Sequence, residues 1–238
     1  MLVFSIVLTL FIICLVPILI RWIRQQRELK KQRLTYLARR SEQVFQALDV
    51  ISDRYLAKDT KVFMIEYLLF IIKQLENANY TSDFLAKHAD IMHWLTDITD
   101  INATKKSSTE KKYAADKKVN TPEQLNQTHN ALKCLRQETR HMAKTYGVSQ
   151  VAIGQHLVNI RYAYALAYRD LLVYQARLDL DSDKKAQALE KYRTALSVME
   201  QNDSVSGAKK EIVQLQGRIN KIEQLLFPNK SKTESKTA

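Results

Sequence analysis

Histidine, cysteine and acidic side chains are the groups of this sequence that could perform chemistry, and their spacing indicates no catalytic or metal site. His88 and His93 are five residues apart, so the two imidazoles do not share one face of a helix. Asp90 and Asp97 lie nearby, but the zinc-binding spacing H-E-x-x-H occurs nowhere in the chain. We therefore expect polar surface roles for these histidines and no bound metal.

Glycine- and cysteine-based motifs are equally sparse. The chain has 4 glycines, no G-x-S-x-G sequence and no C-x-x-C sequence, so neither a phosphate-binding loop nor a nucleophile elbow is indicated. The two cysteines, Cys14 and Cys134, exclude a disulfide framework. Acidic residues fall on the polar faces of periodic segments. We expect a protein without catalytic activity and without a cofactor.

Tyrosines and arginines gather in residues 161–177. They are Tyr162, Tyr164, Tyr168, Tyr174, Arg161, Arg169 and Arg177. One interpretation is base stacking in a nucleic-acid site, and the other is packing within a helical core. Tyr164 and Tyr174 lie on the apolar stripe of the predicted helix. Asp170 and Asp179 offset the arginines. We therefore favour packing.

The composition predicts an all-α fold. With 4 glycines and 3 prolines in 238 residues, the chain has few of the turn residues that a strand-rich fold needs. Leu, Ala, Lys, Gln and Glu, which all favour helices, are abundant. We expect one N-terminal transmembrane helix, residues 1–20, followed by a cytoplasmic bundle of about six helices.

The first residues, MLVFSIVLTLFIICLVPILI, contain no charged side chain. As a helix, residues 2–20 would be about 28 Å long, which is close to the hydrocarbon thickness of a bilayer. No basic residue precedes this run and no small-residue cleavage site follows it, which argues against a cleavable signal peptide. A buried core helix is the other alternative. We expect an uncleaved anchor in a bacterial inner membrane.

Residues 21–33 form a basic juxtamembrane segment directly after this run. Lys and Arg beside a membrane span stay on the cytoplasmic side, where they contact anionic headgroups, and a Trp at this position is typical of an interfacial anchor. The N-terminus is therefore predicted to lie outside and residues 21–238 in the cytoplasm. The residues that would set this topology are Trp22, Arg21, Arg24, Arg27, Lys30, Lys31 and Arg33.

The formal net charge of +12 is concentrated in three segments. Residues 21–40 carry +7, residues 103–118 carry +4, and residues 229–238 carry +2. The rest of the chain is therefore close to neutral. Residues 228–238 are predicted to be a disordered basic tail. The high pI describes these segments and not the folded part.

Residues 34–101 are predicted to form the first helical part of the bundle. Apolar residues repeat at heptad-like spacing in residues 34–55, which predicts a helix that leaves the membrane and runs to about Ala57. Residues 102–120 follow as a lysine-rich flexible linker without apolar periodicity.

Two more helices are predicted within this first part. Asp59 and Thr60 are candidate caps for the next helix, whose residues 61–75 are apolar on nearly all sides. We expect this helix to be buried, with a helix on the membrane surface as the alternative. Residues 81–83, Thr-Ser-Asp, then predict the start of a third helix.

Residues 121–227 are predicted to form the second helical part. The sequence TPEQ, residues 121–124, is a capping box with proline in the first turn, and its helix should end near Gly147. A stripe over residues 153–178, with Ser149 as its cap, predicts a long helix. Residues 179–185, DLDSDKK, interrupt it and offer Asp or Ser as the next cap.

The sequence ALEKYRTALSVME carries Ala188, Tyr192 and Ala195 at an A-x3-Y-x2-A spacing. With the helix before it, residues 169–202 resemble one helical hairpin of the tetratricopeptide-repeat family. The family's proline is absent, and no second repeat is evident in the chain. The resemblance implies protein–protein interaction, although about three repeats are needed for the family's concave groove. A C-terminal helix is predicted to follow the hairpin.

These observations predict a single-pass, membrane-anchored scaffold or adaptor that acts through protein–protein interaction, with an unidentified protein or a second copy of the chain as its partner. The alternatives are a membrane-tethered nucleic-acid-binding protein and a non-catalytic subunit of a membrane complex. Nucleic-acid binding is disfavoured because the folded part is near neutral. The apolar stripes pack within the bundle or form an interaction seam. The seam residues are Tyr164, Leu171, Tyr174, Leu178, Ile212, Leu215, Ile219 and Ile222.

Overall fold

The computed structural model describes the backbone of residues 2–99, 118–145 and 149–227, and the side chains of residues 18–98, 118–142 and 149–227. Within these ranges the chain is all-helical, as predicted, with seven α-helices, one 3-10 helix and no strand. The elements are α1 (Leu2–Val50), α2 (Lys58–Asn77), η1 (Asp83–Lys87), α3 (His88–Thr99), α6 (Pro122–Thr145), α7 (Gln150–Asp181), α8 (Lys185–Glu200) and α9 (Ser206–Leu226).

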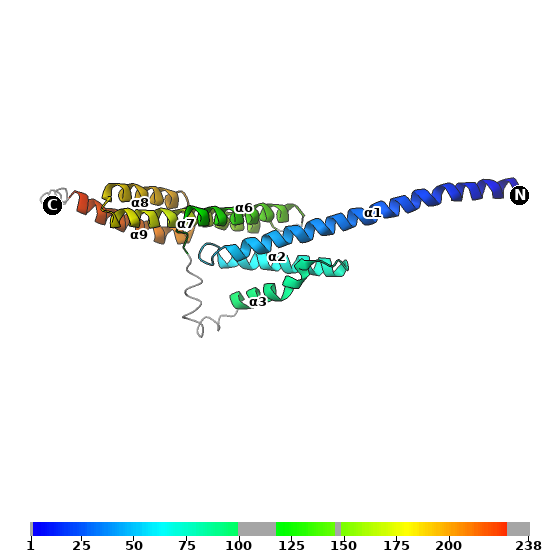
Figure 1. Ribbon diagram of the computed structural model, residues 1–238, viewed down its shortest axis with the longest axis horizontal. Coiled ribbons are helices and arrows are strands. Elements are labelled where there is room, and N and C mark those ends of the chain that lie inside the picture. Colours follow the sequence, from blue (N-terminus) through cyan, green and yellow to red (C-terminus); the bar gives the residue numbers. More distant parts are fainter. Residues whose placement is uncertain (1, 100–117, 146–148, 228–238) are drawn as a thin grey trace.

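The helices form an elongated bundle with the start of α1 and the end of α9 at opposite ends (Figure 1). The N-terminal half of α1 projects alone, whereas its C-terminal half packs against α2 on one side and α6 on the other. From α6 onward each helix packs on the next, so that α7, α8 and α9 form the end of the molecule opposite the projecting helix. Residues 102–117 of the predicted linker 102–120, the predicted helix end at Gly147 and the tail from 228 to 238 lie outside the described residues.

Helix α1 runs without a break from Leu2 to Val50. Its described side chains are exposed from Ile18 to Arg33, and burial in the bundle begins beyond that point, with Ala38 the first fully buried residue. Among the described residues, none of the helices combines the length and the apolar character that a membrane crossing requires. Most of the predicted anchor, residues 1–17, lies outside the residues whose side chains are described.

The end of α1 differs from the prediction, since the helix stops at Val50 and not near Ala57. The apolar pattern continues past the helix end because Ile51, Tyr55 and Leu56 are buried although they belong to a loop. Tertiary contacts hold this loop, including an ion pair from Asp53 to Lys61 at the start of α2. The apolar periodicity therefore predicted the buried positions correctly, but it did not predict where the helix ends.

The predicted caps of α2 are wrong. The helix begins at Lys58 after Ala57, with no side-chain cap, and the Thr60 hydroxyl instead contacts α7. Most apolar side chains of α2 are buried as expected, but Phe70 is 45% exposed. The third predicted helix starts as the 3-10 helix η1, with no cap bond from the Ser82 side chain, and becomes α-helical only at His88.

The capping box of α6 is present as predicted. The Gln124 backbone N–H donates to the Thr121 hydroxyl at 3.2 Å, and the Gln124 side-chain oxygen accepts from the Asn120 backbone N–H at 2.9 Å. The other predicted caps are not formed. Ser149 precedes α7 without a side-chain cap bond, and Lys184 is the residue that precedes α8.

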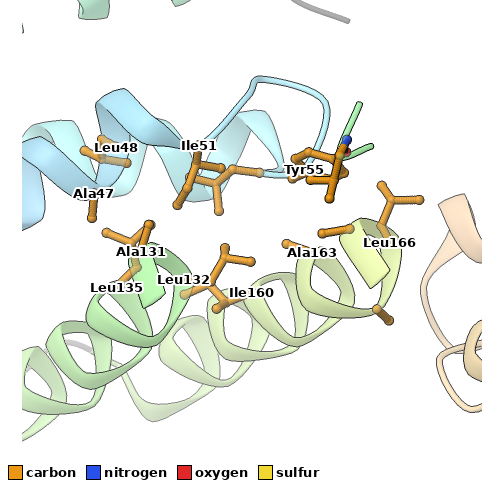
Figure 2. Close-up of a cluster of buried hydrophobic side chains, with 14 of the residues drawn as sticks. Ala47, Leu48, Ile51, Tyr55, Ala131, Leu132, Leu135, Ile160, Ala163 and Leu166 are labelled. Atoms are coloured by element: carbon orange, nitrogen blue, oxygen red, sulfur yellow. The ribbon is translucent and has the colours of Figure 1, made fainter. Parts of the chain in front are cut away.

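One part of the core lies where the end of α1 and the following loop cover α6 and α7. Figure 2 shows Ala47, Leu48, Ile51 and Tyr55 facing side chains of α6 and α7. Helix α7 is the central helix, because it is buried against α6, α8 and α2 along much of its length. Small side chains on α7 and α8, such as Ala167 and Ala188, are fully buried, which permits close approach of helix axes.

Two glycines in α9 provide a matched test of this packing. A Cβ at Gly217 would meet no atom within 4 Å, whereas one at Gly207 would lie 2.9 Å from the Tyr162 hydroxyl. Gly217→Ala is expected to raise the free energy of unfolding by about 0.8 kcal/mol in urea denaturation, because alanine favours a helix. Gly207→Ala should give less or none of this gain. An equal gain at both positions would contradict the placement of Tyr162 against α9.

Candidate functional site

The residues predicted to set topology lie on the projecting part of α1. Arg21, Arg24, Arg27, Lys30, Lys31 and Arg33 are all exposed. Trp22 is 59% exposed, and its apolar neighbours Ile18, Leu19, Ile20 and Ile23 are exposed as well. This part of the helix therefore carries a cluster of uncovered apolar side chains directly before a row of basic ones.

The residues of the predicted seam divide into two groups. Leu171, Leu215, Ile219 and Ile222 are buried in the core, and Tyr164 and Ile212 are half-buried against it. The Tyr164 hydroxyl donates to the His129 carbonyl of α6 at 2.8 Å. Tyr174 and Leu178, at the end of α7, are exposed. Most of the stripe thus packs inside the bundle.

A cluster of charged side chains joins three segments that are distant in sequence. The buried carboxylate of Asp170 in α7 accepts hydrogen bonds from Arg54 Nε at 2.7 Å, Arg54 Nη2 at 3.2 Å and Arg169 Nη1 at 2.7 Å. The Tyr55 hydroxyl donates to the same carboxylate at 3.1 Å. Arg169 also pairs with Glu211 of α9, and Arg54 lies 3.8 Å from that carboxylate. We call Arg54, Tyr55, Arg169, Asp170 and Glu211 the charge cluster.

The electrostatics of the charge cluster follow from burial and close cations. Burial alone would raise the pKa of Asp170, but the hydrogen bonds and charges of Arg54 and Arg169 outweigh it and lower that pKa. Burial and the nearby Asp170 carboxylate raise the pKa of the Tyr55 hydroxyl, which therefore stays a neutral donor. The Asp170 carboxylate is therefore held in its charged form, and its hydrogen bonds hold Arg54, Tyr55 and Arg169 in place.

A second buried carboxylate joins α1, α2 and α6. Glu138, 3% exposed, accepts a hydrogen bond from Arg40 of α1 and another from the Tyr67 hydroxyl of α2 at 2.5 Å. Burial and the nearby Glu138 raise the pKa of the Cys134 thiol, so this thiol is kept in its unreactive protonated form. Both buried carboxylates thus serve as links between helices.

The two histidines of α3, for which polar surface roles were predicted, lie on the surface. His88 and His93 are exposed on α3, where His93 lies 3.2 Å from Asp97. Across the described ranges, no group of three or more His, Cys, Asp or Glu side chains is placed to hold a metal ion. Elsewhere, His156 of α7 contacts the buried Thr60 hydroxyl at 3.1 Å and stacks on Phe63.

The charge cluster was missed at the level of sequence. Arg169 and Asp170 were interpreted as neighbours that offset each other, and Arg54 was not singled out, because it lies 116 residues from Asp170. A usable signal was present, since Arg169 and Asp170 interrupt a segment of α7 that is apolar on nearly all sides. Adjacent opposite charges within such a segment indicate a buried ion pair with partners elsewhere.

Comparison with known proteins finds no match: no family model, no curated protein and no solved structure is similar to this chain. The resemblance of residues 169–202 to a tetratricopeptide hairpin stays a prediction. In the structure α7 and α8 pack on each other, and Ala188, Tyr192 and Ala195 are buried.

Replacing the central carboxylate tests the charge cluster. Asp170→Asn is expected to lower the free energy of unfolding by about 3 kcal/mol at pH 7, because it leaves the buried Arg169 and the half-buried Arg54 beside an uncharged amide. Asp181→Asn, an exposed position on the same helix, is the control and should change stability little. Urea denaturation of the three proteins measures both effects.

The contribution of Asp170 to the free energy of unfolding has a defined pH dependence. The pKa of Asp170 lies below its ordinary value of 3.8 in the folded protein, so the stability it contributes is complete above that pH. It is lost as the pH falls through the lower, folded-state pKa. The difference in free energy of unfolding between the wild type and Asp170→Asn should therefore be constant near neutral pH and become smaller in acid. A difference in free energy of unfolding that stays constant down to strong acid would contradict the charged state of Asp170.

Proposed function

We propose that this chain is an adaptor anchored in a membrane by residues 1–20, with the helical bundle held at the cytoplasmic surface. The observation that carries the proposal is the start of the described part of α1, where exposed Ile18, Leu19, Ile20, Trp22 and Ile23 follow a charge-free sequence. Apolar side chains without a protein partner, next to an interfacial Trp, are typical of the end of a membrane span.

The basic residues after Trp22 support the proposed orientation. The basic side chains from Arg21 to Arg33 are all exposed, and the N-terminal half of α1 projects from the bundle (Figure 1). They are free to contact anionic headgroups, at about 1 kcal/mol for each residue near the surface. Basic residues on this side of the span place the bundle in the cytoplasm. Because α1 continues into the bundle, it would act as a stalk.

The second part of the proposal is that the bundle acts by binding a protein and not by catalysis. This part is supported by the partners that the two buried carboxylates already have. Glu138 and Asp170 are each occupied by arginine and tyrosine partners from other segments, so neither carboxylate is available for acid–base chemistry. A tethered bundle raises the effective concentration of its partner-binding surface at the membrane.

Membrane fractionation tests the anchor. The full chain should sediment with membranes and stay there after an alkaline carbonate wash. The double variant Val7→Arg, Ile13→Arg should be released, because each arginine at the centre of a span costs about 2.5–3.5 kcal/mol. The matched control Val7→Leu, Ile13→Leu keeps the residues apolar and should sediment like the wild type.

Two results would contradict the anchor. One is a wild-type chain that carbonate removes from membranes, and the other is a double arginine variant that sediments as well as the leucine control. Crosslinking of the intact, membrane-embedded chain, followed by capture, then identifies the partner. The leucine control should crosslink the same protein, and the arginine variant should lose it if tethering matters.

A further inference from the structure

A cleft of about 270 Å³ lies beside the charge cluster, between α7, α9 and the loop after α1. Six of its lining residues are basic and two are acidic. The basic ones are Arg54, Lys118, Arg169, Arg177, Lys210 and Arg218. The acidic ones are Asp170 and Glu211 of the charge cluster. The cleft is thus strongly electropositive although the folded part of the chain is near neutral.

Within the described residues, acidic side chains do not neutralise the excess positive charge of the cleft. Arg54 and Arg169 are matched by the carboxylates of Asp170 and Glu211. The other four basic side chains form no ion pair with any acidic residue in the described ranges. Like charges that converge on one concave site repel each other, and an anion between them would relieve that repulsion.

Two buried nitrogen atoms point to the same conclusion. Arg169 is only 5% exposed, and its Nε makes no hydrogen bond within the described part of the chain. Nη1 of Arg218, whose guanidinium lies 5.9 Å from the centre of the Tyr192 ring, is buried and also without a described acceptor. A buried N–H of a charged group without an acceptor is costly, so both groups favour an anionic acceptor in the cleft.

We propose that this cleft binds the phosphate group of a small phosphorylated ligand. Arginine guanidinium groups recognise phosphate through paired, charge-assisted hydrogen bonds, and Lys210 adds a point charge at the mouth. The volume lies just below the range of about 300–1,000 Å³ for sites that enclose drug-sized molecules, so a phosphate and a small remainder fit. Exposed Tyr174 and Gln214 line the same cleft and offer an aromatic face and an amide to that remainder.

The position of the cleft favours a soluble ligand over a lipid headgroup as its occupant. This step rests on the proposed membrane anchor. Along α1, Arg33 and Val50 are separated by about 25 Å. The cleft is lined by Arg54, beyond Val50, and by residues of α7 and α9, and these two helices lie away from the projecting part of α1 (Figure 1). A headgroup in the anchoring membrane would not reach it. A nucleic-acid backbone needs a continuing basic track, whereas these cations converge on one concave site.

Binding is tested on the detergent-solubilised full chain, with inorganic phosphate and pyrophosphate as probes in isothermal titration calorimetry. Pyrophosphate should bind more tightly than chloride at matched ionic strength. The double variant Arg177→Gln, Lys210→Gln should lose affinity by about tenfold or more. Both side chains are exposed and lie outside the charge cluster, so the variant should keep the urea midpoint of the wild type.

The matched control is Arg161→Gln, Lys209→Gln, which removes the same charge from exposed positions of the same two helices outside the cleft. It should bind pyrophosphate like the wild type. Equal loss in both double variants, or no heat with either probe, would overturn the site. Tighter binding of a short single-stranded oligonucleotide, or of vesicles containing phosphatidic acid, would overturn the choice of a small ligand.

These outcomes are separable from those of the anchor. Calorimetry in detergent does not depend on whether residues 1–20 cross a membrane, and fractionation does not depend on Arg177 or Lys210. Pyrophosphate binding by a chain that carbonate removes from membranes would keep the cleft and refute the anchor. A tightly anchored chain that gives no heat with either probe would keep the anchor and refute the phosphate site in the cleft.

Discussion

The buried carboxylate of Asp170 is the interaction on which the arrangement of the bundle depends. It accepts hydrogen bonds from the loop after α1 and from its own neighbour on α7, and that neighbour, Arg169, reaches Glu211 on α9. Three segments are thereby fixed at one point. Desolvation makes such a charge costly unless it is fully matched, so the cluster permits only the packing in which all partners meet.

This constraint explains how the long helix is joined to the rest of the protein. Helix α1 carries an exposed basic stalk at one end and enters the core at the other, where Glu138 binds Arg40 and Asp170 binds Arg54 just past the helix end. The two buried carboxylates hold α1 and the loop after it at two points. The same arrangement brings the surplus cations of α7 and α9 into one cleft.

The sequence predicted features that depend on local chemistry. Few glycines and prolines indicated an all-helical chain, and Thr121 with Gln124 marked the start of α6, because a capping box needs only residues three apart. Ala188 and Tyr192 were correctly placed on a packing face. These features need no information from distant parts of the chain.

Features that depend on distant contacts were missed. The end of α1 was placed too late because the loop residues Ile51 and Tyr55 are buried and continue the apolar pattern. Thr60 was taken as a cap although its hydroxyl bonds to α7. The charge cluster was missed because Arg54 and Asp170 are 116 residues apart, and pairing at that separation follows only from the fold.

The charge cluster is expected to make the projecting part of α1 and the α7–α9 end of the bundle one rigid unit. Pulsed electron paramagnetic resonance between spin labels at Leu29→Cys on α1 and Val213→Cys on α9, both exposed positions, measures this directly once Cys14 and Cys134 have been replaced by serine. We expect a single narrow distribution of the distance between the two labels in an otherwise wild-type chain. A broad or multiple distribution in that chain would contradict it.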